Sequence, residues 1–162
     1  MRVAVISDTH MPRGTRALPP RCAELCREAD AILHAGDFTR VAAYEEIAAL
    51  GPPLHAVRGN VDEAALAWGL PERLVVELGG VRIGMIHMPG PAAGRLLSLR
   101  SAFPDADVAV FGHTHMPEHG HVDGFEIFNP GSPTERRRAP VHTMGLAHVE
   151  DGRVRFEIVD LT

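Results

Sequence analysis

The chain has 162 residues and a formal net charge of −5, with 45% hydrophobic and 23% charged residues. This composition is typical of a folded globular protein and excludes a fibrous or disordered chain. The length predicts a single domain over residues 1–162, and the acidic balance argues against a binding surface for long nucleic acid, since Arg136–Arg138 is the longest basic run.

Short apolar runs rich in β-branched residues alternate with helical patterns in the first part of the chain. Pro19 and Pro20 suit the first turn of a helix, and Gly51 with the two prolines after it suits a helix end. The predicted elements are a strand near 2–7, a helix to about 29, a strand that stops at Gly36, a helix over 41–50 and a strand that leads to Gly59. This order predicts a β-α-β-α-β unit.

The rest of the chain is richer in strands. We expect strands over 73–78 and 81–87, a helix over 93–103, a strand over 107–111 and strand-like runs in the last 45 residues, and we interpret the segment around Trp68 as a connection. Gly79-Gly80 readily supplies the positive φ angles of a two-residue hairpin turn, so the sheet is predicted to be mixed. An α/β layer from the first part and a second sheet from the strand-rich end predict two facing sheets with helices outside.

Five polar motifs stand where an apolar run stops. They are Asp8-Thr9-His10, Gly36-Asp37, Gly59-Asn60-Val61-Asp62, His87 and Gly112-His113-Thr114-His115. Ligands of open α/β sheets bind beyond the carboxyl ends of the strands, so we expect the motifs to meet at one rim. Each motif alone is typical of a loop, a helix cap or a buried polar group, but their ordered conjunction indicates a site.

The residue types in these motifs point to metal ions. Histidine nitrogens with carboxylate and amide oxygens suit Mn²⁺, Fe²⁺, Co²⁺, Ni²⁺ or Zn²⁺ better than Ca²⁺. Asp8 and His10 are two apart in an extended segment and can face one ion, Asp37 can bridge to a second ion, and Asn60 adds a neutral oxygen. Two ions about 3.5 to 4 Å apart can acidify a bridging water and stabilise in-line attack on a phosphate ester. The sequence therefore predicts a hydrolase site.

The remaining polar residues have weaker functional claims. His34 is interpreted as a packed, hydrogen-bonded core histidine. Asp62 either orients a neighbouring histidine or caps a turn. Arg13 and Arg136–Arg138 are interpreted as solvated, with a phosphate contact as the alternative. Four other histidines are interpreted as surface or cross-strand residues: His119, His121, His142 and His148.

The two cysteines and the hydropathy pattern bear on the cellular location of the protein. Cys22 and Cys26 are four apart on a predicted helix, which matches neither a zinc knuckle nor a redox motif, so we interpret them as reduced thiols packed on one helical face. No apolar stretch approaches the roughly 20 residues that a membrane span needs. Met1 and Arg2 lead directly into a strand rather than a signal sequence, and we expect a cytoplasmic protein.

At these motifs the chain resembles the calcineurin-like metallophosphoesterases, whose pattern is Asp-x-His, Gly-Asp, Gly-Asn-His-Asp or a variant, a lone histidine, and Gly-His-x-His. Its length, the segment 32–37 and the loop Asn129–Ser132 are most similar to the short bacterial and archaeal YfcE-type phosphodiesterase branch. The resemblance covers nearly the whole chain. It implies a four-layer α/β/β/α sandwich of two mixed sheets flanked by helices.

The same resemblance implies an activity and a cofactor. The expected protein is a metal-dependent phosphoesterase, a phosphodiesterase before a monoesterase, that hydrolyses small phosphate esters by attack of a hydroxide bridging two divalent metals. Manganese is the first candidate, and Ni, Co, Fe and Zn are alternatives. The implied metal ligands are Asp8, His10 and His115 for one ion, Asn60, His87 and His113 for the other, and Asp37 as the bridge. Catalytic roles fall to Asp37, Asn60 and His113.

The chain departs from the family pattern at two positions. Val61 stands where many relatives place the histidine that helps to protonate the leaving group, and Met88 rather than glycine follows His87. Because valine cannot transfer a proton, we expect activated or low-pKa leaving groups to be preferred.

Two other classes of function remain open. One is a non-catalytic, metal-binding protein-interaction scaffold on the same fold, as in the retromer subunit that resembles these enzymes but has an impaired metal site. The filled ligand positions here argue against it. The other is a nuclease on long nucleic acid, which the missing basic stripe disfavours. The expected partners are a small phosphate ester and, at most, further copies in a small homo-oligomer, with no membrane.

Overall fold

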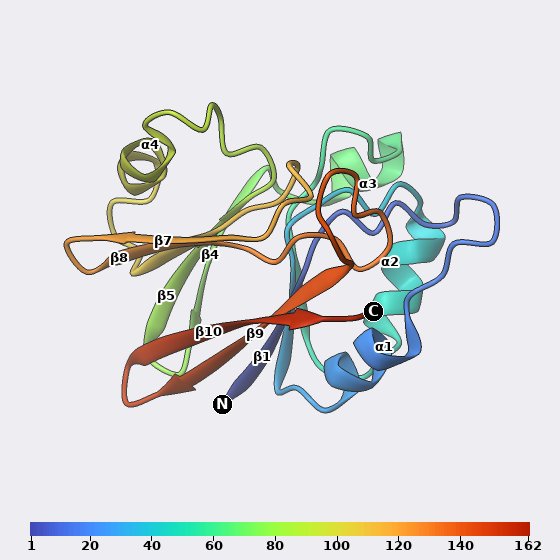
Figure 1. The fold of residues 1–162 in the computed structure, drawn as a ribbon, viewed down its shortest axis with the longest axis horizontal. Helices are drawn as coiled ribbons and strands as arrows, with labels where there is room; N and C mark the ends of the chain where they lie inside the picture. Colours follow the sequence, from blue (N-terminus) through green and yellow to red (C-terminus); the bar gives the residue numbers. More distant parts are fainter.

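The computed structural model describes residues 1–162 and contains two five-stranded mixed sheets with helices on their outer faces (Figure 1). The strands are β1 (Arg2–Ile6), β2 (Ala31–His34), β3 (Leu54–Ala56), β4 (Arg73–Leu78), β5 (Val81–Ile86), β6 (Val108–Val110), β7 (Glu118–Val122), β8 (Phe125–Asn129), β9 (Thr143–Glu150) and β10 (Arg153–Asp160). The helices are α1 (Pro20–Arg27), α2 (Val41–Ala48), α3 (Ala64–Gly69) and α4 (Arg95–Ala102). None of these helices is both long and apolar enough to cross a bilayer.

The first sheet has the strand order β10-β9-β1-β2-β3. Its strands β1, β2 and β3 are parallel, as the predicted β-α-β-α-β beginning requires. Helices α1 and α2 cover its outer face, where Leu25 and Ile47 pack in one apolar cluster with Ile32. Cys22 and Cys26 are buried free thiols in the same cluster, which confirms the expectation of small packed side chains.

The second sheet has the strand order β4-β5-β6-β8-β7, with β5, β6 and β8 parallel. Strands β4 and β5 form the predicted hairpin, and its turn residues Gly79 and Gly80 have φ angles of 57° and 81°. These angles are in the left-handed region that a two-residue hairpin turn needs. Helix α4 covers the outer face through Leu99 and Phe103.

One apolar cluster lies between the inner faces of the two sheets. It combines Val5 and Leu33 of the first sheet with Ile83, Val110 and Phe128 of the second. Burying a side chain of this size stabilises a fold by about 1.5 to 3 kcal/mol, so this interface fixes one sheet against the other. The predicted four-layer α/β/β/α sandwich is confirmed, and the loops that follow strands of both sheets are held in one place.

Two expectations about the elements were wrong. The segment around Trp68 contains α3, because Leu66 buries its side chain in the first-sheet cluster while Trp68 remains 90% exposed. The late strands do not form a second sheet of their own: β9 and β10 complete the first sheet, and β7 and β8 join β4, β5 and β6. Strand β9 pairs with the otherwise open edge of buried β1, whose backbone groups need partners.

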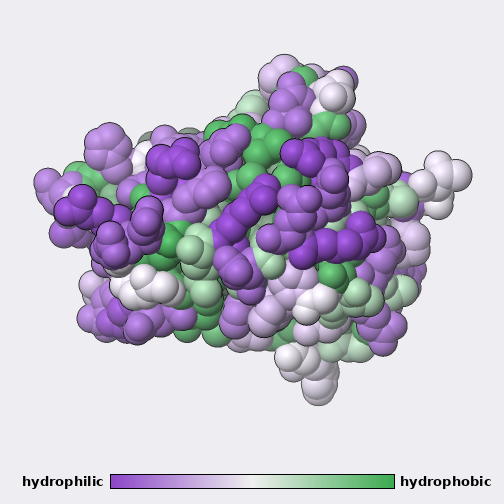
Figure 2. Space-filling model, turned by 90° about the horizontal axis from the view of Figure 1, so that it is seen from below, coloured by the Kyte–Doolittle hydropathy of each residue, from purple (hydrophilic) through white to green (hydrophobic).

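One face of the molecule is largely polar. Figure 2 shows that hydrophilic residues cover most of the face seen from below. The edge strand β10 exposes Arg153, Arg155 and Glu157. Charged side chains on an edge strand disfavour pairing with the edge of another sheet.

Candidate metal centre

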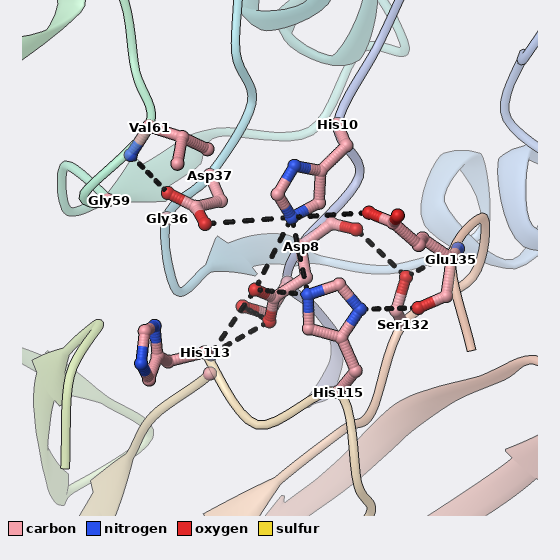
Figure 3. A network of polar contacts seen from close by, with 12 residues as sticks. Asp8, His10, Gly36, Asp37, Gly59, Val61, His113, His115, Ser132 and Glu135 are labelled. Carbon is pink, nitrogen blue, oxygen red and sulfur yellow. Dashed lines mark hydrogen bonds and ion pairs between the residues drawn. The ribbon is translucent and has the colours of Figure 1, made fainter. Parts of the chain in front are cut away.

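The five polar motifs meet at one rim of the sandwich. Asp8, Asp37 and Asn60 follow β1, β2 and β3 of the first sheet, and His87 and His113 follow β5 and β6 of the second. The structure brings all seven predicted site residues together. Figure 3 shows the side chains of His10 and His115 pointing toward the carboxylate of Asp8.

Asp8, His10 and His115 form one group of possible metal ligands. The Nε2 atom of His115 lies 3.2 Å from Oδ1 of Asp8 and 3.2 Å from Nε2 of His10. The Nε2 atom of His10 lies 3.8 Å from the same Asp8 oxygen. Two imidazole nitrogens and a carboxylate oxygen therefore converge from β1 and β6, which belong to different sheets.

A second group lies around Asp37. The Oδ2 atom of Asp37 is 3.1 Å from Nε2 of His87 and 3.5 Å from Nε2 of His10. Asn60 Oδ1 lies 3.0 Å from Nε2 of His87 and 3.0 Å from Nδ1 of His113. Asp37 thus lies between His10 and His87. Asn60 lies on the more exposed side of this second group.

Backbone carbonyls fix the tautomers of two of the histidines. The Nδ1–H of His87 donates to the carbonyl oxygen of Ala35 at 2.7 Å, and the Nδ1–H of His115 donates to the carbonyl oxygen of Glu135. A histidine that donates from Nδ1 keeps its Nε2 lone pair when neutral, and both Nε2 atoms face the carboxylates. Met88 after His87 does not prevent this arrangement, because His87 is buried while Met88 is exposed.

Both aspartates are held ionised. Burial raises the pKa of the Asp8 carboxyl, but hydrogen bonds with His10 and His115 and the charge of His87 bring that pKa well below its usual value. Burial likewise opposes ionisation of Asp37, and its hydrogen bond with His87 lowers the pKa overall. The pKa of His87 is correspondingly raised: burial lowers it, and the carboxylates of Asp37 and Asp8 outweigh burial.

Neither buried carboxylate has a lysine or arginine partner. Every ion pair of Asp8 and Asp37 is with a histidine, and both side chains are almost completely buried. Buried charges in proteins are paired or coordinate metals, because the cost of desolvation is otherwise too large. The donor set of carboxylate, imidazole and amide groups fits divalent ions of the Mn²⁺ to Zn²⁺ series.

The ligand loops have unusual backbone geometry. Five of the seven site residues have positive φ angles: Asp8 (56°), His10 (44°), Asp37 (61°), His113 (69°) and His115 (59°). Left-handed backbone is uncommon for residues other than glycine and clusters at functional sites, where the surrounding fold maintains it. This geometry gives no signal in the sequence.

Two glycines allow the loops to approach one another. A Cβ atom on Gly59 would collide with the carboxylate and the backbone nitrogen of Asp37, and one on Gly112 would collide with Ser7 and with the carboxylate of Asp8. Neither glycine has a positive φ angle. They are needed for space, so that a carboxylate can lie directly against the neighbouring backbone.

Asp62 is a positioning residue. Its Oδ2 atom accepts the backbone N–H of Gly59 at 2.7 Å and that of Asp37 at 3.3 Å, and its Oδ1 atom accepts the N–H of Thr39 at 2.7 Å. The carboxylate therefore joins the loop after β2 to the loop after β3. Of the two roles left open by the sequence, it supports the backbone that presents the candidate ligands.

The last residue of β8 and two residues of the loop that follows it support the site from the other side. The Ser132 hydroxyl donates to the carbonyl oxygen of Asp8 at 2.8 Å, and the Thr134 hydroxyl donates to that of Thr9 at 2.6 Å. The Asn129 side chain donates to the carbonyl oxygen of Gly112 at 3.1 Å. Asn129 and Ser132 entered the sequence analysis only through the family pattern, because their partners are more than ten residues away in the chain.

His34 is a core histidine, as expected, and it joins two of the ligand loops. Its Nδ1 atom accepts the backbone N–H of Gly36 at 3.1 Å, so its Nε2–H is free to donate to the Thr9 hydroxyl at 3.1 Å. Its ring stacks on Phe38. Burial lowers the pKa of His34 to about 3, which keeps the ring neutral.

The comparison with known proteins identifies the family. Residues 1–152 match the family model of the calcineurin-like phosphoesterase superfamily domain. The chain belongs to this superfamily. It is 32% identical to a probable metallophosphoesterase of Methanothermobacter thermautotrophicus, in a match that covers 98% of this chain and 92% of that protein.

Solved structures of similar proteins share the fold. Wild-type Vps29 of Entamoeba histolytica, complexed with Zn²⁺, matches with a TM-score of 0.78 and 28% identity over 100% of both chains. The solution structure of a Thermotoga maritima protein matches with a TM-score of 0.77 and 29% identity over 98% of both chains. The resemblance drawn from the sequence motifs is therefore confirmed.

Replacing His34 by phenylalanine tests its role as a support. His34→Phe keeps the stacked ring but leaves the Thr9 hydroxyl and the Gly36 N–H without partners, so the free energy of unfolding should fall by about 2 to 4 kcal/mol at pH 7.5. Because the folded pKa of about 3 lies below the ordinary value of 6.5, the stabilising effect of neutral His34 is complete above pH 6.5 and is lost as the pH falls toward 3.

Urea unfolding of both proteins between pH 7.5 and 4 measures this effect. The difference in the free energy of unfolding between wild type and His34→Phe should become smaller as the pH falls. The control is His55→Phe, a half-buried histidine of β3 without a side-chain hydrogen bond, which should change stability by no more than about 0.5 kcal/mol. A difference that does not vary with pH would contradict the assignment.

Adding one methyl group at Gly59 tests the close approach to Asp37. Gly59→Ala should displace the Asp37 carboxylate and weaken Mn²⁺ binding by about 10- to 100-fold, as measured by isothermal titration calorimetry. Gly69→Ala is the matched control, since a Cβ atom there meets nothing within 4 Å. Equal affinities of the two variants would show that the tight contact does not orient Asp37.

Proposed function

We propose that this protein is a metal-dependent phosphoesterase that hydrolyses small phosphate esters, with diesters preferred over monoesters. One observation carries the proposal: the buried carboxylates of Asp8 and Asp37 face converging histidines and have no lysine or arginine partner. Membership of the calcineurin-like phosphoesterase superfamily supports the same conclusion.

The proposed ligand roles follow the two groups of side chains. Asp8, His10 and His115 hold one divalent ion, Asn60, His87 and His113 hold the other, and Asp37 bridges them. Manganese is our first candidate, with Ni, Co, Fe and Zn as alternatives, because the donor set is a mixture of nitrogen and oxygen. Such a pair supplies, when bound, acidification of a water molecule and neutralisation of charge on the phosphate.

Asp37, Asn60 and His113 have different proposed roles at the metal centre. Val61 donates its N–H to Oδ1 of Asp37 at 3.0 Å, which leaves Oδ2 directed between His10 and His87, the position that a bridging ligand needs. Asn60 is exposed and His113 half-exposed, so substrate enters on their side. The pKa of His113 is lowered, first by burial and then by the charge of His87, and the neutral ring can bind an ion or orient a phosphate oxygen.

The preference for diesters rests on the space around the centre. A pocket of about 420 Å³ opens on the side of His10 and Val61, and another of about 360 Å³ opens on the side of Asn60 and His87. A phosphodiester has two substituents on phosphorus. The two pockets offer one compartment to each substituent, whereas a monoester would leave one of them empty.

A second candidate function is a non-catalytic scaffold that binds metal. The observation that favours it is the similarity to Vps29 over the full length of both chains. Assays of metal binding and of ester hydrolysis separate the two functions, because a scaffold would bind metal without hydrolysing any ester.

Removing the charge of Asp37 tests the phosphoesterase proposal. With Mn²⁺ and bis(p-nitrophenyl) phosphate, Asp37→Asn should lower kcat/KM by about 100-fold or more, since the bridging charge is lost, and a chelator should abolish wild-type activity. Asp105→Asn, on the exposed surface, is the control and should behave as wild type. Activity that survives both chelation and Asp37→Asn would overturn the two-metal mechanism. Metal binding without turnover on a panel of diesters and monoesters would favour the scaffold.

Restoring a histidine at position 61 tests the missing acid. The Val61 side chain is 46% exposed and lines the pocket on the side of His10. Val61→His should raise kcat/KM for diesters with alkyl leaving groups by about 10- to 100-fold. It should have little effect on p-nitrophenyl esters, because the p-nitrophenolate group leaves without protonation. Val61→Gln, which cannot donate an acidic proton, is the control. An equal change for both classes of ester would count against this role.

A further inference from the structure

The pocket of about 420 Å³ beside His10 and Val61 has an unusual charge for this protein. Three of its lining residues are arginines, Arg13, Arg40 and Arg137, and Glu135 is its only acidic residue. The whole chain has a net charge of −5. Positive charge is therefore concentrated at one opening next to the candidate metal centre, and we call this opening the arginine pocket.

The three guanidinium groups are weakly engaged within the protein. Arg13 lies 3.6 Å from Glu135 and its side chain is 73% exposed, and Arg40 lies 3.1 Å from Glu63 and is 61% exposed. Arg137 is exposed and forms neither an ion pair nor a side-chain hydrogen bond within the chain. Exposed ion pairs stabilise a protein by no more than about 1 kcal/mol, so these groups can exchange partners readily.

Glu135 shows that an anion fits between the arginines and the centre. Its Oε2 atom lies 3.7 Å from Nε2 of His10 and 3.4 Å from the guanidinium of Arg16, and Figure 3 shows the carboxylate directed at His10. This oxygen is buried but accepts no hydrogen bond. A buried oxygen held only by longer contacts is a weak occupant of a position that suits negative charge.

Thr39 adds a second unsatisfied group to the same pocket. Its hydroxyl oxygen is buried without a hydrogen-bond partner, and its φ angle is 85°, which is exceptional for a β-branched residue. Unpaired polar atoms and backbone strain in one pocket are typical of a ligand site.

We propose that the arginine pocket binds a second phosphate group of the substrate. The substrate class is then a phosphodiester with a further phosphate on the neighbouring sugar or alcohol, as in a dinucleotide with a terminal phosphate. Guanidinium forks match phosphate oxygens geometrically, and the pocket volume is in the range that accepts a nucleoside-sized group. The assignment rests on the proposed function, because the scissile phosphate is placed at the metal centre.

The first test compares hydrolysis of dithymidylate with and without a terminal phosphate in the presence of Mn²⁺. The ratio of kcat/KM values should favour the phosphorylated substrate by about tenfold or more, the usual worth of a charge-assisted hydrogen bond. Arg13→Gln and Arg137→Gln should each lower this ratio, and the double variant should bring it near one. The matched control is Arg27→Gln, an exposed arginine of α1 without an ion pair, which should leave both rates and the ratio unchanged.

The second test measures binding alone, so that failure of the pocket and failure of the proposed function can be told apart. Titration calorimetry with Mn²⁺ present should show that thymidine 3′,5′-bisphosphate binds more tightly than thymidine 5′-monophosphate, through Arg13 and Arg137. Hydrolysis without preference for the extra phosphate would overturn the pocket assignment and leave the proposed function standing. A preference in binding that depends on these arginines, without hydrolysis of either dinucleotide, would support phosphate binding in the pocket and overturn the proposed function.

Discussion

Two carboxylates, Asp8 and Asp37, are buried at the rim of the two packed sheets, and the surrounding structure is arranged to stabilise their charges. Burying a charge costs free energy unless donors and opposite charge surround it. Asp8 accepts the backbone N–H of His113 and the hydroxyl of Ser7, and Asp37 accepts the N–H of Val61. These neutral donors keep the carboxylates oriented. Neutral histidines do not compensate the negative charge of the two carboxylates. Divalent ions of the proposed kind would compensate it.

The loops that present these groups are strained, and the fold maintains the strain. Positive φ angles at most of the site residues cost free energy of order 1 to 3 kcal/mol each, which must be offset by the surrounding structure. Asp62 ties two loops together, Ser132 holds the carbonyl of Asp8, and His34 joins the loops after β1 and β2. The apolar interface between the sheets provides the rigid base on which a site can be pre-organised.

The sequence predicts most of this molecule, and the parts that it does not predict have a common cause. Strands, motif order and the meeting of the motifs at one rim follow from local patterns and from the rule on strand ends. The pairing of β9 with β1, the bonds of Asp62 to the backbone of Asp37 and Thr39, and the supporting role of Ser132 depend on contacts between distant parts of the chain, which no local pattern records. In the sequence, Arg13 and Arg137 are far apart and a solvated role is favoured over a phosphate contact; only the fold brings them to one pocket beside the centre.

Anomalous diffraction at the manganese edge, from crystals grown with Mn²⁺, tests the central claim most directly. We predict two peaks on either side of the Asp37 carboxylate. The expected neighbours are Asp8, His10 and His115 for the first peak, and Asn60, His87 and His113 for the second. A single peak, or peaks away from these side chains, would contradict the two-metal centre on which the proposed phosphoesterase activity depends.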